Sequence, residues 1–246
     1  TFSIDARREV DILTKTRNAP HRNLLKIIHI QDQIEAERFE DKKVWIISEL
    51  CDLGDLNAYV EAYDVSLYNT LDITDQACSG LLHLHSMTPP VIHRDIKPSN
   101  VLLIDVNGRH EVRLCDFGIA REIDGSEMTS KVGTETYKAP ELYADSQSYT
   151  EKVDVFALGI TLLQMILYDA SKKLKLEKVL DNIILSHKKQ NSNKTLKTVG
   201  LLMYKTRSEF EIQDLKSVSI ADQIQMSSVK SLISKMLCTN SRRRLD

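Results

Sequence analysis

One segment of the chain concentrates residues that could do chemistry. His93–Asn100 reads HRDIKPSN and leads into an apolar run, and two further motifs, Asp116-Phe117-Gly118 and Ala139-Pro140-Glu141, follow it in that order. Carboxylate and amide oxygens are the ligands that a hard cation such as Mg²⁺ prefers, and a carboxylate can also accept the proton of a hydroxyl group. Three such motifs in this order are far more specific than any one of them alone.

These motifs resemble the signature of eukaryotic serine/threonine protein kinases, in which they form the catalytic loop, the DFG motif and the APE motif. The resemblance implies that Asp95 is the catalytic base and that Lys97 contacts the transferred phosphate. It implies that Asn100 and Asp116 are catalytic residues that bind Mg²⁺, with ATP and Mg²⁺ as cofactors. Lys97 and Thr134 match the serine/threonine branch of the family rather than the tyrosine kinases. Taken singly, each residue could instead be an ordinary loop or turn residue.

The resemblance also implies residues that contact the nucleotide. Glu9 matches the glutamate of the family's regulatory helix, which pairs with a lysine on the third strand. Glu49 and Cys51 match the hinge, where backbone groups hydrogen-bond adenine, and Leu102 is expected to line the same pocket. Cys115 would line it too, where a small buried thiol without reactivity is the simpler interpretation.

The sequence departs from the family at its beginning. It starts at Thr1 and contains no glycine-rich loop and no third-strand lysine ahead of Glu9, the parts that hold the phosphates in the resembling kinases. We therefore expect part of a longer kinase that is weakly active by itself. A kinase-like scaffold, or pseudokinase, that acts by binding proteins is the alternative. A small-molecule phosphotransferase is disfavoured by the APE motif, which serves protein substrates in the resembled family.

The segment between the DFG and APE motifs predicts regulation. The resemblance implies that Arg94 and Arg121 form a basic site for a phosphate, which Ser130, or else Thr129, would carry. A phosphate brings about -1.5 to -2 charge and three acceptor oxygens, so it would order the segment and place Thr134. An upstream kinase or self-phosphorylation would add it. The alternative is that these hydroxyls only make the loop hydrophilic.

Other matches to the family are structural. Asp154 is expected to hydrogen-bond the backbone of the catalytic loop, and Glu141 is expected to pair with Arg244. A column of residues that aligns the two lobes in such kinases is matched by Leu13, Ile27, His93 and Phe117.

The spacing of apolar residues predicts the main elements. A partly exposed amphipathic helix is expected over 3–17, and short β-branched runs predict strands over 24–30 and 44–50. The pattern then becomes helical, with a long helix over 70–86 and a buried central helix over 153–168.

These elements predict an α+β, bilobal protein-kinase-like fold. Residues 1–50 would form part of a small β-containing N-lobe, and residues 51–246 a larger, mostly helical C-lobe. Two strand-like runs at 101–104 and 112–115 flank an Asn-Gly turn signal. A long variable region is expected at about 172–225.

Composition narrows the function classes. The 246 residues are 42% hydrophobic and 28% charged, which indicates a globular protein, and a net charge of -2 gives no basic field for nucleic acid. No run is long and apolar enough for a membrane span. The four cysteines are far apart, which suggests neither a zinc site nor a disulfide framework and favours a reducing compartment, the cytoplasm or nucleus. The expected partners are protein substrates.

Overall fold

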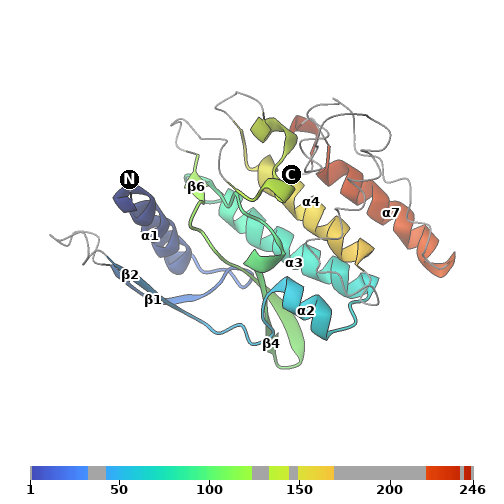
Figure 1. Ribbon diagram of the computed structural model, residues 1–246, viewed down its shortest axis with the longest axis horizontal. Helices are drawn as coiled ribbons and strands as arrows, with labels where there is room; N and C mark the ends of the chain where they lie inside the picture. Colours follow the sequence, from blue (N-terminus) through green and yellow to red (C-terminus); the bar gives the residue numbers. More distant parts are fainter. Residues whose placement is uncertain are drawn as a thin grey trace.

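The structure is a computed structural model with a small sheet-containing part beside a larger helical part (Figure 1). It describes residues 2–32, 43–123, 133–143, 149–168, 220–238 and 241–244. The arrangement is the α+β, two-part architecture that the sequence predicts.

The small part consists of helix α1 (Phe2–Asn18) and an antiparallel pair of strands, β1 (Ile27–Asp32) and β2 (Val44–Ser48). The helix and the second strand confirm the predictions, except that β2 ends two residues early. The first strand begins at Ile27 rather than at residue 24, because Leu25 donates its backbone N–H to the Leu114 carbonyl, 2.9 Å away, in the larger part.

The larger part is built on helices α2 (Leu56–Ala62), α3 (Leu67–His85), α4 (Lys152–Leu167) and α7 (Ile220–Met236). Helix α4 packs between α3 and α7, as Figure 1 shows. It is apolar around most of its circumference, so it is buried on nearly all sides, as predicted. A Cβ atom on Gly159 would lie only 2.8 Å from the Met236 Cβ, so a glycine there allows the close approach of α7.

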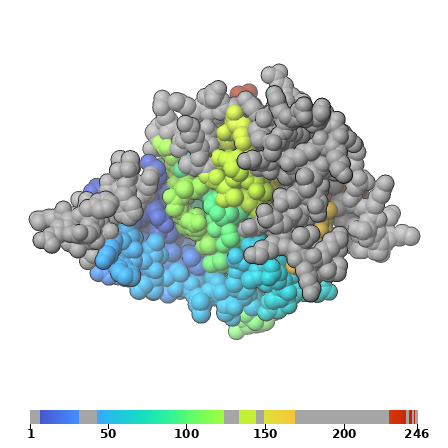
Figure 2. Space-filling view, viewed as in Figure 1, coloured from blue at the N-terminus to red at the C-terminus, as the bar shows by residue number. Residues whose placement is uncertain are grey.

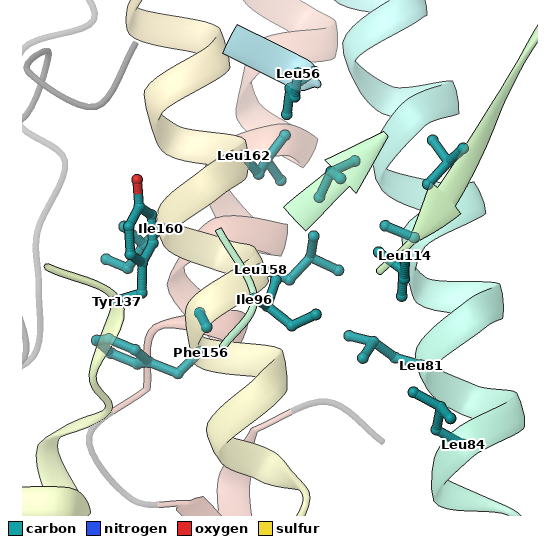
Figure 3. Packing of buried hydrophobic residues seen from close by; sticks show 14 of the residues in the cluster. Leu56, Leu81, Leu84, Ile96, Leu114, Tyr137, Phe156, Leu158, Ile160 and Leu162 are labelled. Atoms are coloured by element: carbon teal, nitrogen blue, oxygen red, sulfur yellow. The ribbon is translucent and has the colours of Figure 1, made fainter. Parts of the chain in front are cut away.

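The core lies where these elements meet. Figure 3 shows side chains of α3, α4 and the catalytic segment pointing toward one another, among them Leu81, Ile96 and Leu158. Ile96 is completely buried, which fixes the backbone next to Asp95, the expected catalytic base.

A hairpin of β4 (Val101–Val106) and β5 (Arg109–Leu114) confirms the two predicted strand-like runs, each somewhat longer than expected. Asn107 and Gly108 turn it with positive φ angles of 56° and 81°, a conformation that asparagine and glycine adopt more readily than other residues. Strands β3 (Val91–Ile92) and β6 (Arg121–Glu122) form a second short pair. Short 3₁₀ helices complete the described chain: Pro98–Asn100, Glu135–Tyr137, Pro140–Tyr143 and Ser241–Arg243.

Most of the predicted variable region at 172–225 lies outside the described residues; its last six residues belong to α7. In the part of the chain that the structure describes, no helix is both long and apolar enough to cross a membrane. All four cysteines are free thiols.

Candidate active site

The catalytic loop is anchored by the buried helix α4. After β3 the chain turns sharply, with Arg94 at a positive φ of 66°. The carboxylate of Asp154, which is fully buried on α4, accepts the backbone N–H groups of His93 and Arg94, both at 2.8 Å. This confirms the predicted contact. It also explains how a turn that side-chain-bearing residues rarely adopt is held in place.

The side chain of Asp95 is the centre of the site. Its carboxylate accepts hydrogen bonds from Lys97 Nζ at 2.7 Å and from Asn100 Nδ2 at 3.1 Å. It also accepts the Thr134 hydroxyl at 2.8 Å and the Thr134 backbone N–H at 3.2 Å. Four residues that the sequence singled out, on two segments of the chain, are therefore brought together at one carboxylate.

The protonation of Asp95 follows from these contacts. Burial is the largest single influence and raises its pKa, but the hydrogen bonds from Lys97 and Thr134 together outweigh it, so the pKa lies below its usual value. The carboxylate is therefore ionised at neutral pH. A weak base of this kind serves by orienting a hydroxyl group, which is what a reaction governed by positioning requires.

Asn100 and Asp116 offer oxygens that fit a divalent cation. The Asn100 amide nitrogen donates to both the carbonyl and the carboxylate of Asp95, at 2.8 and 3.1 Å, which leaves its amide oxygen as the group to bind a cation. Asp116 is exposed, and its Oδ1 accepts the Gly118 N–H at 3.3 Å. Within the described ranges, no three His, Cys, Asp or Glu side chains gather into a metal site. A cation held by few protein oxygens and by phosphates needs no such cluster.

The residue after Asp116 is packed inward. Phe117 is 2% exposed, and its ring centroid lies 5.2 Å from that of His93, whose Nε2 pairs with the Cys115 carbonyl at 2.9 Å. Leu13 and Ile27 are buried in the same core, as their place in the predicted column requires. The contact between the His93 and Phe117 rings holds the Asp116 segment against the catalytic loop.

Figure 2 shows this face of the molecule. Green surface lies between the blue N-terminal part and the yellow-green segment of residues 133–143.

A family model described as the protein kinase domain matches residues 2–246 of the chain. The chain belongs to the protein kinase family. Among its relatives, mitogen-activated protein kinase 13 of Arabidopsis thaliana is 35% identical over 172 residues, which cover 66% of this chain and 43% of that protein. Extracellular signal-regulated kinase 1 of Candida albicans (strain WO-1) is 34% identical over 164 residues, covering 65% of this chain and 37% of that protein. The chain thus spans less than half the length of these relatives.

Glu9 of this kinase domain faces the DFG segment. A Cβ atom on Gly118 would lie 3.8 Å from Glu9 Oε1. Burial, and next the negative charge of Asp116, raise the pKa of Glu9 above its usual value. The helix thus brings Glu9 to the expected place, but the sequence contains no third-strand lysine to pair with it.

Glu49 is held by other parts of the protein. Its Oε1 accepts the Lys26 backbone N–H at 2.8 Å and Arg113 Nε at 3.0 Å, and its backbone N–H donates to the Lys26 carbonyl at 3.0 Å. The sequence predicted backbone contacts with adenine here, and the Glu49 carbonyl accepts the Ser48 hydroxyl at 3.2 Å. Burial, and next the Glu49 charge, raise the pKa of the Cys51 thiol to about 11. Leu102 lies half-buried on β4, where it forms a β-bridge to the residue that caps α2.

Cys115 is a structural thiol. Burial raises its pKa to about 12, and its sulfur lies 3.6 Å from the Asn100 carbonyl. It is therefore protonated at neutral pH and a poor nucleophile, which agrees with the simpler of the two interpretations.

Arg94 has partners within the protein. Its Nε donates to the Ile119 carbonyl at 2.5 Å and its Nη1 to the Tyr149 hydroxyl at 2.8 Å. Arg121 lies on β6, opposite Ile92. The two predicted phosphorylation sites, Thr129 and Ser130, lie outside the described residues. Tyr149, which sequence analysis did not single out, is 6% exposed just ahead of α4. Its contact with Arg94 spans 55 positions, so no local sequence signal indicates it.

The predicted ion pair between Glu141 and Arg244 is confirmed. Arg244 Nη2 lies 2.7 Å from Glu141 Oε2, and Arg244 is only 4% exposed. Its guanidinium also lies 5.0 Å from the centre of the Phe156 ring on α4. The pair ties the segment after Thr134 to the end of the chain, and losing one partner would leave a buried charge.

Proposed function

We propose that this kinase domain transfers the γ-phosphoryl group of ATP, bound with Mg²⁺, to serine and threonine hydroxyls of protein substrates. The observation that carries the proposal is the ionised Asp95 carboxylate, which Lys97, Asn100 and Thr134 hold in one orientation. Phosphoryl transfer asks for positioning and charge neutralisation more than for covalent chemistry.

Each of the clustered residues has a distinct role in that reaction. Asp95 accepts a hydrogen bond from the substrate hydroxyl and orients it toward the phosphate. Lys97, whose Nζ lies 2.7 Å from Asp95 Oδ2 and 3.1 Å from Thr134 Oγ1, offers a positive charge to the transferred group. Asn100 and Asp116 would hold Mg²⁺, which supplies neutralisation of the phosphate charge.

The scaffold alternative has less support. A protein that acts only by binding has no need for Asp95, Lys97, Asn100 and Thr134 in one hydrogen-bonded cluster. Serine and threonine are favoured over tyrosine by Lys97 and Thr134. Both relatives named above carry kinase names, which agrees with protein substrates for this chain.

The proposal includes regulation of the kinase activity by phosphorylation. Phosphorylation of Ser130 or Thr129, by an upstream kinase or by the protein itself, would add contacts to an Arg94 that Tyr149 already holds.

The proposed location is a reducing compartment, the cytoplasm or nucleus, which the four free thiols favour.

The test uses a completed chain, in which a glycine-rich loop and a lysine-bearing strand from a related kinase are joined ahead of Phe2. The completed chain is incubated with labelled ATP, Mg²⁺ and peptides that differ only in carrying serine, threonine or tyrosine. We expect label on serine and threonine and none on tyrosine. A completed chain that binds ATP but labels no peptide, or labels tyrosine as well as serine, would contradict the proposal.

A further inference from the structure

Four side chains of alternating charge form a row behind the hinge, which we define as residues 48–51. The row runs from Arg22 through Glu111 and Arg113 to Glu49. Its members come from the loop after α1, from β5 and from the hinge itself. Glu111 and Arg113 are two residues apart on β5, so their side chains leave the strand on the same face.

Each contact in the row is a charge-assisted hydrogen bond. Arg113 Nε donates to Glu49 Oε1 at 3.0 Å, and Arg113 Nη1 donates to Glu111 Oε2 at 3.1 Å. Glu111 Oε1 accepts in turn from Arg22. One guanidinium therefore bridges two carboxylates with different nitrogens, a geometry that the single ammonium of a lysine does not reproduce.

The middle of the row is removed from water. Glu111 and Arg113 are each 8% exposed, whereas the Arg22 side chain at the outer end is 55% exposed. Burial is the largest influence on Glu111 and raises its pKa, but the hydrogen bonds from Arg113 and Arg22 together bring the pKa below its usual value. Removing one partner from such a pair is costly because the other charge stays buried.

The row acts directly on the hinge backbone. Glu49 Oε1, which accepts from Arg113, also accepts the Lys26 N–H, and the Glu49 N–H donates back to the Lys26 carbonyl. Glu49 is thereby fixed by both its side chain and its main chain. Two residues beyond the hinge, Leu53 donates its N–H to the Leu103 carbonyl at 3.2 Å, which ties the hinge to β4.

We infer that Arg113 and Glu49 form a clasp that fixes the hinge backbone relative to β5, so that both are positioning residues for the nucleotide. Where it concerns ATP the inference rests on the proposed function. Neither side chain takes part in the cluster around Asp95, and the sequence assigned only the backbone at Glu49 to the nucleotide. The clasp gives the side chain of this glutamate a role as well, because it holds the chain whose carbonyl groups would meet adenine.

The first test measures amide hydrogen exchange in the 246-residue chain and in two variants, Glu49→Gln and Arg113→Lys. Glu49→Gln keeps an acceptor for the Lys26 N–H but removes the negative charge. Arg113→Lys keeps the positive charge but loses the two guanidinium nitrogens that bond Glu49 and Glu111 separately. We expect exchange in the segments 24–28 and 48–54 to rise about tenfold, a factor in the range of one charge-assisted hydrogen bond. Exchange in α3 and α4 is expected to stay unchanged.

Lys15→Gln is the matched control, since it removes the ion pair between α1 and Glu122 on β6, away from the hinge. It is expected to leave the hinge segments as they are. Unchanged hinge exchange in Glu49→Gln would overturn the inference, and so would a rise of equal size throughout the protein, which would make the row a general stabilising feature. If Arg113→Lys fails to fold, Glu49→Gln decides alone.

The second test titrates MgADP into the completed chain and into the same two variants of it. It follows the fluorescence of Trp45, the single tryptophan of the 246 residues, which lies on β2 just ahead of the hinge. We expect both variants to bind MgADP about tenfold more weakly than the completed chain without the substitutions. Equal affinity despite looser hinge amides would overturn the role toward the nucleotide. A completed chain that binds no MgADP, while its variants still show looser hinge amides, would support the clasp and count against the proposed function instead.

Discussion

The small sheet and the helical part differ in how completely their apolar side chains are covered. On β2, Trp45 is 59% and Ile47 is 54% exposed, and Ile46 on the opposite face is 42% exposed. On α4, Phe156 and Ile160 are both 0% exposed. One part is therefore packed like a protein interior, whereas the other presents apolar surface on both faces of a strand.

The difference coincides with a division of the active site. The groups proposed to orient the hydroxyl, centred on Asp95, are anchored to the packed part through Asp154 on α4. Glu9, which is expected to contribute to the nucleotide site, lies on α1 in the small part, near Asp116. Under the proposed function, the groups that orient the hydroxyl therefore belong to the packed part, and the phosphate-holding parts that the resemblance implies would have to be supplied beside the sheet.

Adding the phosphate-holding parts should have the largest effect. The completed chain is expected to exceed the 246-residue chain in kcat/KM by about a thousandfold or more, because the added loop and lysine position the phosphates. The measurement is labelled phosphate transfer to a serine peptide at equal protein concentrations. Equal turnover by the two proteins would show that these parts are not needed.

The helical part and the small sheet should also differ in how much a substitution lowers the free energy of unfolding. Phe156→Ala removes a fully buried ring from α4 and should lower the free energy of unfolding by about 3–5 kcal/mol. Ile47→Thr on the exposed strand should change it by no more than ~0.5 kcal/mol. Urea denaturation of both variants gives the comparison. A loss from Ile47→Thr as large as that from Phe156→Ala would mean that the sheet is as well covered as the core.

The hydroxyl of Tyr149 should matter for the chemical step. Tyr149→Phe removes the group that accepts from Arg94 Nη1, so the loop next to Asp95 is held less firmly. In the completed chain we expect kcat to fall by about three- to tenfold with the KM for ATP unchanged. Tyr59→Phe is the control, because its hydroxyl pairs with His110 at 2.7 Å away from the site. The idea fails if both substitutions lower kcat equally.

The smallest effect concerns pH, where the two parts should respond with opposite sign. The pKa of Glu111 is lowered on folding, so its stabilising contribution is present above the ordinary value of 4.5 and is lost as the pH falls through the folded pKa. The pKa of Glu9 is raised, so its contribution is present below 4.5 and is lost as the pH rises through the folded pKa.

The check is urea unfolding of two glutamine variants across this range. At neutral pH, Glu111→Gln should be less stable and Glu9→Gln more stable than the unchanged chain, and both differences should disappear in acid. Differences of the same sign would contradict the assignment of these charges. So would a Glu9→Gln difference that persists below the ordinary glutamate pKa, or a Glu111→Gln difference that persists below the lowered folded pKa of Glu111.

Much of the packed part could be predicted from the sequence because its signals are local. Asp95, Lys97 and Asn100 lie within one short segment, so their spacing alone implies that they can meet. The buried helix α4 and the hairpin turn at Asn107 and Gly108 were predicted for the same reason, from an apolar run and from residues that tolerate positive φ.

The remaining features depend on partners that local spacing does not specify. Glu49 contacts Arg113 across 64 positions, and Arg94 contacts Tyr149 across 55. The sequence therefore singled out Glu49 and Arg94 but did not indicate these partners. Similarly, Leu25 looked like part of a strand, yet its backbone pairs with Leu114 from the other part of the molecule.

The most direct test of the account is Asp95→Asn in the completed chain. The substitution keeps the size and most hydrogen-bonding positions of the side chain but removes the ionised acceptor, and Asp64→Asn on an exposed loop serves as its control. We expect kcat for serine phosphorylation to fall by about 10²–10⁴-fold, with MgADP affinity unchanged. A kcat close to that of the Asp64→Asn control would contradict the claim that the Asp95 cluster is the catalytic centre.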